Sequence, residues 1–484
     1  MSGAGYREVM ARKNEIMLGS LGIDYAPYAR GTLAFDYEGL LRDTGYDLEK
    51  VAAVQRRTAV GDTPLVELQN LSAVVRAVSP PGKGARIFLK DEAANPSGSF
   101  KDRRASLSAY EAQRRGYPGI AAASSGNYGA AVASQAAKLG LDAIIVQEVF
   151  DSAGREQPEL AEKTRACEAY GAEVLRLSVG PELFFQYLIT LEETGFFNAS
   201  LYSPFSILGI ETLGAEIAEQ MRQRTGAAPD VVIATNAGGG NVTGTARGLR
   251  RAGAGDTRMI GASVDLQGLH MASDHDFNRK SFTTGHTGFS IPFATWPDRS
   301  DVPRSAARPL RYLDRLVTVT QGEVFYITQA LAELEGMERG PAGNTSLAAA
   351  VSIARELDRE QTLVVQETEY TGAGKHPLAQ LNFARERGIE VRRGDPRENT
   401  PGRSIVIPEH PRQFAVVDLD LDGLRRSYMR NTVTHGGDPA GLTGEDYRFL
   451  AEETRLSQAA VREVLAGDAA GEKSKEHTGD ADRQ

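Results

Sequence analysis

The stretch that decides the fold is residues 91–108, which read DEAANPSGSFKDRRASLS. Residues 86–90 before it are typical of a strand, and residues 105–115 after it are typical of a helix. Between them, Asn95-Pro96-Ser97-Gly98 predicts a turn, because proline fixes φ and glycine permits a positive φ. We therefore expect Lys101 at a loop-to-helix junction, behind a Ser-Gly-Ser segment with little side-chain bulk.

A lysine in that place has room for a large flat partner. The partial positive charge of a helix N-terminus favours an uncharged amine, which is the state that a Schiff-base lysine needs. The alternative is a solvated lysine at a helix start, and this stretch alone leaves both interpretations open.

Two more motifs follow in the chain, Ser124-Ser125-Gly126-Asn127-Tyr128-Gly129 and Asn236-Ala237-Gly238-Gly239-Gly240-Asn241. Their order after the Ser-Phe-Lys turn resembles that of the fold-type II pyridoxal-phosphate (PLP) enzymes, the superfamily of tryptophan synthase β and threonine synthase. The resemblance covers roughly residues 55–395. It implies an α/β fold with two open, twisted, mostly parallel sheets flanked by helices, and helical extensions at both ends.

The resemblance also implies roles for the residues of these motifs. Lys101 would carry PLP as an internal aldimine and would then move the substrate α-proton. Asn127 would bond the phenolic oxygen of the cofactor. The substrate would be bound by Ser124, Ser125, Gly126 and Tyr128. From the residues alone, helix capping is the alternative role of Ser124 and Ser125, and both roles are compatible.

The second motif predicts a phosphate cup between a strand and a helix. Small residues expose backbone N–H groups there, and the helix dipole favours a phosphate dianion. The residues of the cup are Gly238, Gly239, Gly240, Asn241 and Thr243. A Gly-rich turn that holds no ligand is the alternative.

Two later motifs bear on the reaction. Thr371 in Thr-Gly-Ala-Gly resembles the threonine that meets the pyridine nitrogen in threonine synthases, but Ala373 replaces the usual histidine there. Because Glu367 and Glu369 lie close by, the partner of the nitrogen stays open. Gly340 stands where the Glu-Pro-Ser/Ala-Gly motif of dehydratases has glutamate, which argues against a simple serine or threonine dehydratase.

Strand and helix patterns alternate at short spacing along most of the chain, as in an open α/β sheet. Residues 265–312 break the alternation and are rich in aromatic side chains, so we expect a functional segment there. The predicted domains are a helical extension (1–57), a large PLP-binding domain (58–96 and 206–410), a small mobile α/β domain (97–205), a helical appendage (411–466) and a disordered tail (467–484).

Composition narrows the class of protein. The 484 residues carry a net charge of −9 and one cysteine, Cys167. No broad basic field for nucleic acid, no membrane span, no signal peptide and no internal disulfide is expected, so the sequence predicts a cytoplasmic protein. His270, His275 and His286 lack metal-ligand spacing, so we expect no metal site.

Several stretches, among them residues 9–17, 90–96, 282–289 and 366–375, are similar to one subfamily, the PLP-binding β subunits of 2-amino-4-ketopentanoate thiolases. This resemblance implies cleavage of 2-amino-4-oxopentanoate with coenzyme A to acetyl-CoA and alanine, or the reverse condensation, in ornithine degradation. It also implies a small α subunit as partner and a homodimeric core. The alternatives are a threonine synthase-like or lyase enzyme and a non-catalytic PLP-site partner protein.

Overall fold

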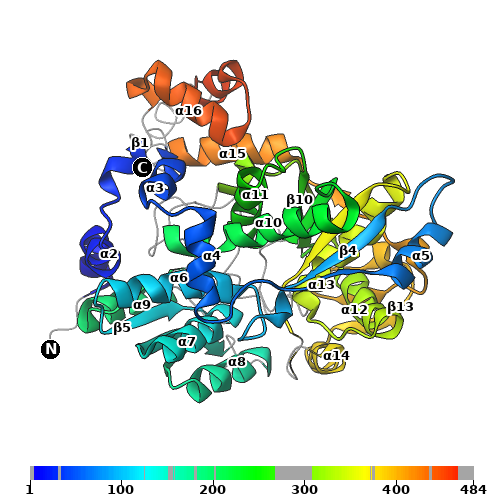
Figure 1. Ribbon diagram of the computed structural model, residues 1–484, viewed down its shortest axis with the longest axis horizontal. Helices are drawn as coiled ribbons and strands as arrows, with labels where there is room; N and C mark the ends of the chain where they lie inside the picture. The colour runs from blue at the N-terminus through cyan, green and yellow to red at the C-terminus, as the bar shows by residue number, and fades with distance from the viewer. Residues whose placement is uncertain are drawn as a thin grey trace, which may run out of the picture.

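The computed structural model describes residues 5–30, 34–124, 126–150, 156, 158–178, 182–200, 203–266, 308–370, 372, 376–434 and 439–466. They form parallel β-sheets flanked by helices, which confirms the predicted fold class (Figure 1). Residues 267–307 with the three histidines, Ser125, Thr371 and the tail 467–484 lie outside the described residues. Among the helices that are described, none is long and apolar enough to cross a membrane.

The larger sheet has seven strands in the order β15-β11-β10-β9-β12-β4-β3. Its strands are β3 (Leu65–Glu67), β4 (Arg86–Asp91), β9 (Val231–Thr235), β10 (Arg258–Val264), β11 (Arg315–Val319), β12 (Thr362–Glu367) and β15 (Val417–Asp418). Neighbours pair in parallel except at the two edges, where β3 pairs with β4 and β15 with β11 in antiparallel fashion.

Helices cover both faces of this sheet. Ile87 and Leu89 of β4 share a core with α5 (Gln69–Ala77), α12 (Gln321–Glu335) and α13 (Pro341–Glu356). Phe88, which points the other way, shares a core with α10 (Pro204–Thr225) and α11 (Gly240–Arg251). Apolar residues in succession are what a parallel strand needs when both of its faces are buried.

The smaller sheet has four parallel strands in the order β7-β6-β5-β8. They are β5 (Gly119–Ala123), β6 (Asp142–Phe150), β7 (Glu173–Ser178) and β8 (Phe197–Asn198). The helices around it are α6 (Lys101–Arg114), α7 (Asn127–Leu139), α8 (Pro158–Ala169) and α9 (Glu182–Thr194) (Figure 1). All four strands fall within residues 97–205, the predicted small domain, whose boundaries stay a prediction. Because α6 packs on both α7 and α10, it joins the layers of the two sheets.

Helices at both ends of the chain pack onto this body. At the N-terminus these are α1 (Tyr6–Ala11), α2 (Lys13–Leu21), α3 (Tyr37–Asp43) and α4 (Leu48–Arg56), with a short hairpin of β1 (Ala29–Arg30) and β2 (Ala34–Phe35). Helix α2 contacts α9, whereas α3 and α4 contact α10. The N-terminal segment therefore reaches from the small sheet to the large one.

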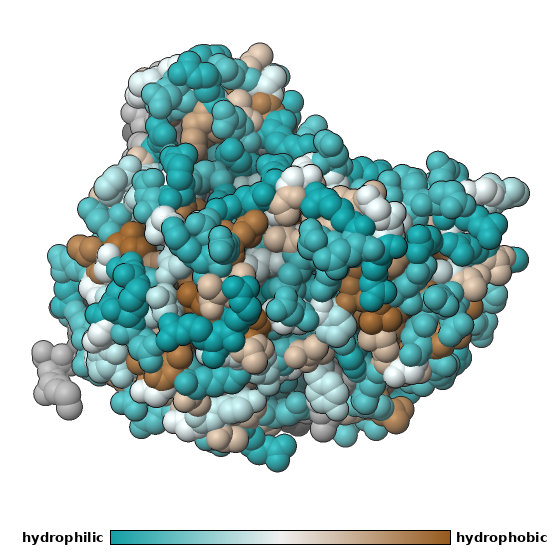
Figure 2. All heavy atoms as spheres, in the orientation of Figure 1, coloured by the Kyte–Doolittle hydropathy of each residue, from teal (hydrophilic) through white to brown (hydrophobic). Residues whose placement is uncertain are grey.

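The C-terminal part adds α14 (Pro377–Glu386), a parallel pair of β13 (Glu390–Arg393) and β14 (Ser404–Ile407), α15 (Leu421–Thr434) and α16 (Gly444–Thr454). Helix α16 ends before Arg455, which adopts a left-handed conformation (φ 56°), and residues 458–466 form a separate helix. The face in Figure 2 is mostly hydrophilic, with apolar residues in small groups.

Candidate active site

Three neighbouring parallel strands of the large sheet bring the candidate residues together. The order β9-β12-β4 places the glycine cup after β9, Glu367 and Glu369 at the end of β12, and the Lys101 loop after β4. Since carboxyl ends of parallel strands meet at one edge, loops from all three gather there. This edge is where open α/β sheets bind their ligands.

Lys101 is the first residue of α6, so the predicted loop-to-helix junction is correct. Its side chain is half-buried, and its Nζ lies 4.7 Å from the centroid of the Phe100 ring. The prediction that the helix starts at residue 105 was wrong, because Asp102 secures an earlier start. Its Oδ2 accepts hydrogen bonds from the backbone N and the Oγ of Ser97, at 2.7 and 2.6 Å. Burial raises the pKa of Asp102 to about 6.

The loop before Lys101 is fixed by the segment that follows β12. The N–H of Phe100 donates to the carbonyl of Thr368 (3.0 Å), and the N–H of Tyr370 donates to the carbonyl of Gly98 (2.7 Å). Gly98 has φ +81°, as the predicted turn requires. The backbone around Lys101 is therefore held by the segment after β12, which is distant from it in the sequence.

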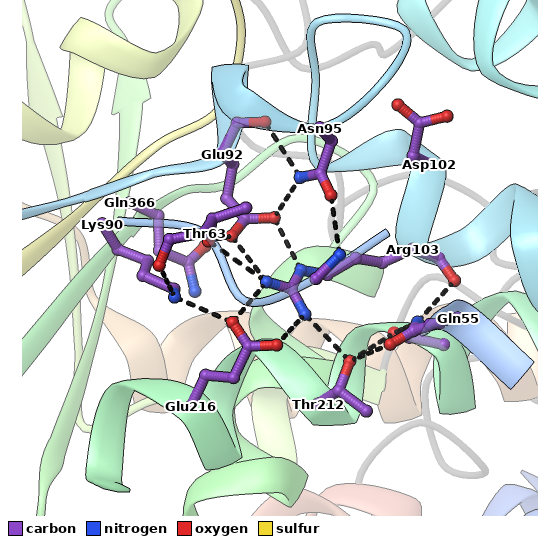
Figure 3. A network of polar contacts seen from close by, with 12 residues as sticks. Gln55, Thr63, Lys90, Glu92, Asn95, Asp102, Arg103, Thr212, Glu216 and Gln366 are labelled. Atoms are coloured by element: carbon purple, nitrogen blue, oxygen red, sulfur yellow. Dashed lines mark hydrogen bonds and ion pairs between the residues drawn. The ribbon is translucent and has the colours of Figure 1, made fainter. Parts of the chain in front are cut away.

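A buried network of charges surrounds Arg103, two residues after Lys101, and was missed in the sequence (Figure 3). Arg103 is fully buried and forms double hydrogen bonds with both Glu92 and Glu216. Lys90 also donates to Glu216, at 2.8 Å. Burial opposes ionisation of Glu216, but Arg103 and Lys90 outweigh it and hold its pKa at about 2. The network locks α6 onto β4 and α10, and no local pattern in the sequence signals it.

The glycine cup has the geometry expected of an anion site. Gly239 adopts φ +79° and precedes α11, whose first residue is Gly240. The hydroxyl of Thr243 donates to the carbonyl of Gly239 (2.8 Å), which fixes the turn. Asn241 is 7% exposed, and its Oδ1 is buried without a hydrogen-bond partner. The N–H groups of the first turn can therefore receive a phosphate, whereas Oδ1 of Asn241 is an acceptor and would need a donor. Gly238 is half-buried beside them.

The loop after β5 approaches the same place from the small sheet. Ser124 accepts hydrogen bonds from the N–H groups of Gly126 (3.3 Å) and Gly129 (3.0 Å), so it caps α7 as one of its two predicted roles requires. Asn127 donates through Nδ2 to Oε2 of Glu369. Tyr128 is 1% exposed and belongs to the core of the small sheet. Its role as a substrate ligand stays a prediction, as do those of Ser125 and Thr371.

Two glycines make room for the glutamates at the end of β12. A Cβ atom on Gly340 would lie 2.5 Å from Cγ of Glu369, and one on Gly343 would lie 2.0 Å from Oε1 of Glu367. Both glutamates are 1% exposed. Burial, and then the charge of Glu369, raise the pKa of Glu367 well above its usual value. In the sequence, acidic residues that directly follow a buried strand were the signal for this pair.

Two arginines near residue 310 form ion pairs with acidic side chains. Arg311 pairs with Glu453 (2.8 Å), and Arg315 pairs with Glu356 (2.7 Å) and Asp418 (2.5 Å). These ion pairs tie the C-terminal helices and β15 to the large sheet.

Comparisons with known proteins agree with this geometry. The family model described as "Pyridoxal-phosphate dependent enzyme" matches residues 56–369. The chain is 62% identical over 460 residues to a 2-amino-4-ketopentanoate thiolase beta subunit from an unknown prokaryotic organism, covering 95% of this chain and 97% of that protein. It is 59% identical to the protein of the same name from Acetoanaerobium sticklandii, covering 95% and 98%. A solved threonine deaminase from "T.th." shares 26% identity at a TM-score of 0.52, covering 68% of this chain and 99% of that one.

Proposed function

Because the chain belongs to the pyridoxal-phosphate dependent enzymes, we propose that it binds PLP and works as the β subunit of a 2-amino-4-ketopentanoate thiolase. The reaction is the cleavage of 2-amino-4-oxopentanoate by coenzyme A to acetyl-CoA and alanine, or the reverse condensation. The observation that carries this proposal is the identity of 62% and 59%, over 95% of the chain, to two proteins of that name.

The described residues fit the cofactor. The N–H groups at the start of α11 suit its phosphate, and Lys101 and Asn127 suit its aldehyde and phenolic oxygen. When bound, PLP stabilises negative charge next to the amino group of the substrate. Lys101 would take and return the α-proton at Nζ. Ser124 and Gly126 would orient the substrate carboxylate at the start of α7.

The acetyl group must leave on a thiol that the chain itself does not provide. Cys167 is the only cysteine in the sequence. It is fully buried, and burial raises its pKa to about 12. A buried protonated thiol is a poor nucleophile. Direct attack of the coenzyme A thiol on the C4 carbonyl of the substrate accounts for the reaction without an acylated cysteine.

The names of the two relatives also bear on partners. Both are β subunits, which supports a complex of this chain with an α subunit. We further propose a homodimeric core and a cytoplasmic location, as the sequence predicts. Both stay predictions.

A thiol-release assay tests the proposed function. The purified chain, with and without a small α subunit, receives PLP, acetyl-CoA and D- or L-alanine, and free coenzyme A is followed. We expect coenzyme A release with one alanine enantiomer and formation of 2-amino-4-oxopentanoate. Lys101→Ala should abolish both the release and the visible absorbance of bound PLP. No release with the partner present, together with phosphate or ammonia production from another amino acid, would instead assign a lyase or synthase activity.

A further inference from the structure

Two carboxyl groups lie in the candidate site and have not been assigned a role in the reaction. Glu367 ends the central strand β12 and Glu369 follows it, between the glycine cup after β9 and the Lys101 loop after β4. Each is 1% exposed. Buried carboxyl groups are costly unless they are paired or protonated, so their presence at this edge calls for a reason.

Glu369 lies at the junction of the two sheets. Its backbone pairs with Ser99, two residues before Lys101, and its Oε2 accepts a hydrogen bond from Asn127. Its carbonyl oxygen also accepts from the N–H of Gly340 (3.1 Å). Glu369 therefore touches the loop of the candidate Schiff-base lysine and the candidate ligand of the phenolic oxygen at once.

Glu367 lies beside it and deeper. Its Oε1 is 3.4 Å from the backbone N–H of Glu369, and its Oε2 is fully buried without a hydrogen-bond partner. Gly340 and Gly343, at the start of α13, are the positions at which any larger side chain would collide with the pair. The two glycines therefore leave the space that the two buried carboxyl groups occupy.

The surroundings of Glu367 favour its protonated form. Asp91 and Arg339 are the other charged groups that act on Glu367, and they are bound to each other, with Nε of Arg339 2.7 Å from Oδ1 of Asp91. Burial and the charge of Glu369 keep the pKa of Glu367 far above its usual range, although Arg339 acts in the opposite direction. Burial and a neighbouring carboxyl group thus both favour the protonated form of Glu367.

The proposed reaction needs such a group. In the cleavage direction the S–H bond of the thiol breaks and an S–C4 bond forms. The C3–C4 bond breaks with its electron pair left on C3, and a C3–H bond forms. One proton thus moves from sulfur to C3, and nothing is oxidised or reduced. Since Lys101 is engaged with the α-proton, a second acid–base group has to carry this one.

Resting on the proposed function, we propose that Glu369 is that group and that Glu367 supports it. Glu369 accepts the thiol proton while the S–C4 bond forms and then delivers it to C3. Glu367 accepts from the backbone N–H of Glu369 and so holds that residue in place. Glu369 is thereby a catalytic residue, and Glu367 is a positioning residue that acts through it.

Hydrogen exchange into alanine separates the two proton transfers. The holoenzyme, with its α subunit, is incubated with alanine in D2O without coenzyme A, and deuterium is followed at the α-carbon and at the methyl group. We expect both exchanges in the wild type. Glu369→Gln should keep the α exchange and slow the methyl exchange by about 100-fold or more, with a parallel loss of acetyl-CoA formation. Glu367→Gln should slow the methyl exchange by a smaller factor.

Glu323→Gln is the matched control. Glu323 is also 1% exposed, and burial raises its pKa to about 7, but it lies in α12 and binds Thr320 and the N–H of Ala415. Both exchanges should be unchanged in this variant. A readout independent of activity is the infrared spectrum of the cofactor-free protein in D2O, in which Glu367→Gln should remove one protonated-carboxyl band.

The outcomes that contradict the inference are distinct. Methyl exchange at the wild-type rate in Glu369→Gln overturns it, and so does an equal loss of α and methyl exchange, which would mean that Glu369 only holds Asn127 in place. An infrared spectrum unchanged by Glu367→Gln overturns the protonated state of Glu367 and with it the supporting role of this residue. A wild type that neither cleaves the substrate nor exchanges the methyl group overturns the proposed function itself.

Discussion

Replacing Arg103 by methionine should destabilise the whole chain and loosen the start of α6. Arg103 is fully buried between Glu92 and Glu216, with Nε 2.6 Å from Glu92 and Nη2 2.7 Å from Glu216. Methionine has a similar length and fills the space with an apolar side chain. It leaves the carboxyl group of Glu92, which is 0% exposed, without its ionic partner.

The size of the effect follows from the charges left behind. Removal of one partner from a buried ion pair costs about 3–5 kcal/mol. The pKa of Glu216 gives a second value. Burial favours the protonated form of Glu216, yet Arg103 and Lys90 lower its pKa from 4.5 to about 2. That shift corresponds to about 3 kcal/mol at neutral pH, shared between the two cations. We therefore expect a loss of about 3–5 kcal/mol in the free energy of unfolding.

The dependence on pH identifies the cause. A carboxyl group whose pKa is lowered by folding contributes stability above its unfolded pKa and loses it as the pH falls toward the folded value. The difference in the free energy of unfolding between the wild type and Arg103→Met should therefore be full above about pH 5 and should narrow between pH 4.5 and 2.

Urea denaturation followed by circular dichroism measures the change, and Arg114→Met is the control. Arg114 lies on the same helix and binds Glu111 with two hydrogen bonds, but its side chain is 52% exposed. Its loss should cost below about 1 kcal/mol. Arg103→Met should also bind PLP more weakly than Arg114→Met, because α6 begins at Lys101. Equal midpoints for the two variants, or a difference that does not vary with pH, would refute the reasoning.

Three further predictions concern packing, pH and the small loop. Gly248→Ala should lower the free energy of unfolding by about 2 kcal/mol or more in thermal unfolding, because its Cβ would lie 1.9 Å from the carbonyl oxygen of Glu211. Gly19→Ala, in open space on α2, should instead stabilise the protein by about 0.5–1 kcal/mol. Equal effects of the two substitutions would contradict the packing argument. Folding raises the pKa of Glu323 to about 7 through burial. The contribution of Glu323 to the free energy of unfolding is therefore full below pH 4.5 and is lost as the pH rises through 7. Glu323→Gln should flatten the fall in stability across that window, and an unchanged slope would count against this prediction. Ser124→Ala should cost about 1 kcal/mol in chemical denaturation, because the N–H groups of Gly126 and Gly129 lose their acceptor; Ser124→Thr, which keeps the hydroxyl, should lose less.

Local patterns in the sequence were enough for the fold class and the order of the site. The alternation of strand and helix patterns predicted an open α/β sheet, and two of its strands, β9 and β12, are central in the large sheet. The Asn-Pro-Ser-Gly turn placed Lys101 at the start of a helix, and the glycine run after residue 237 placed a helix N-terminus opposite it. These features depend on the conformational limits of single residues and on periodicity over a few turns, which the sequence carries directly.

The sequence did not determine which charged groups are buried and what they face. Arg103 meets Glu216 across 113 residues, and Asn127 meets Glu369 across 242. Nothing near Glu367 in the chain shows that Gly343, in helix α13, leaves space for its carboxyl group. The ionisation of a side chain depends on its burial and on the sum of nearby charges, and both arise only when distant segments pack together. The tertiary structure therefore decided that the ends of β4, β9 and β12 form one site, and that two glutamates lie within it.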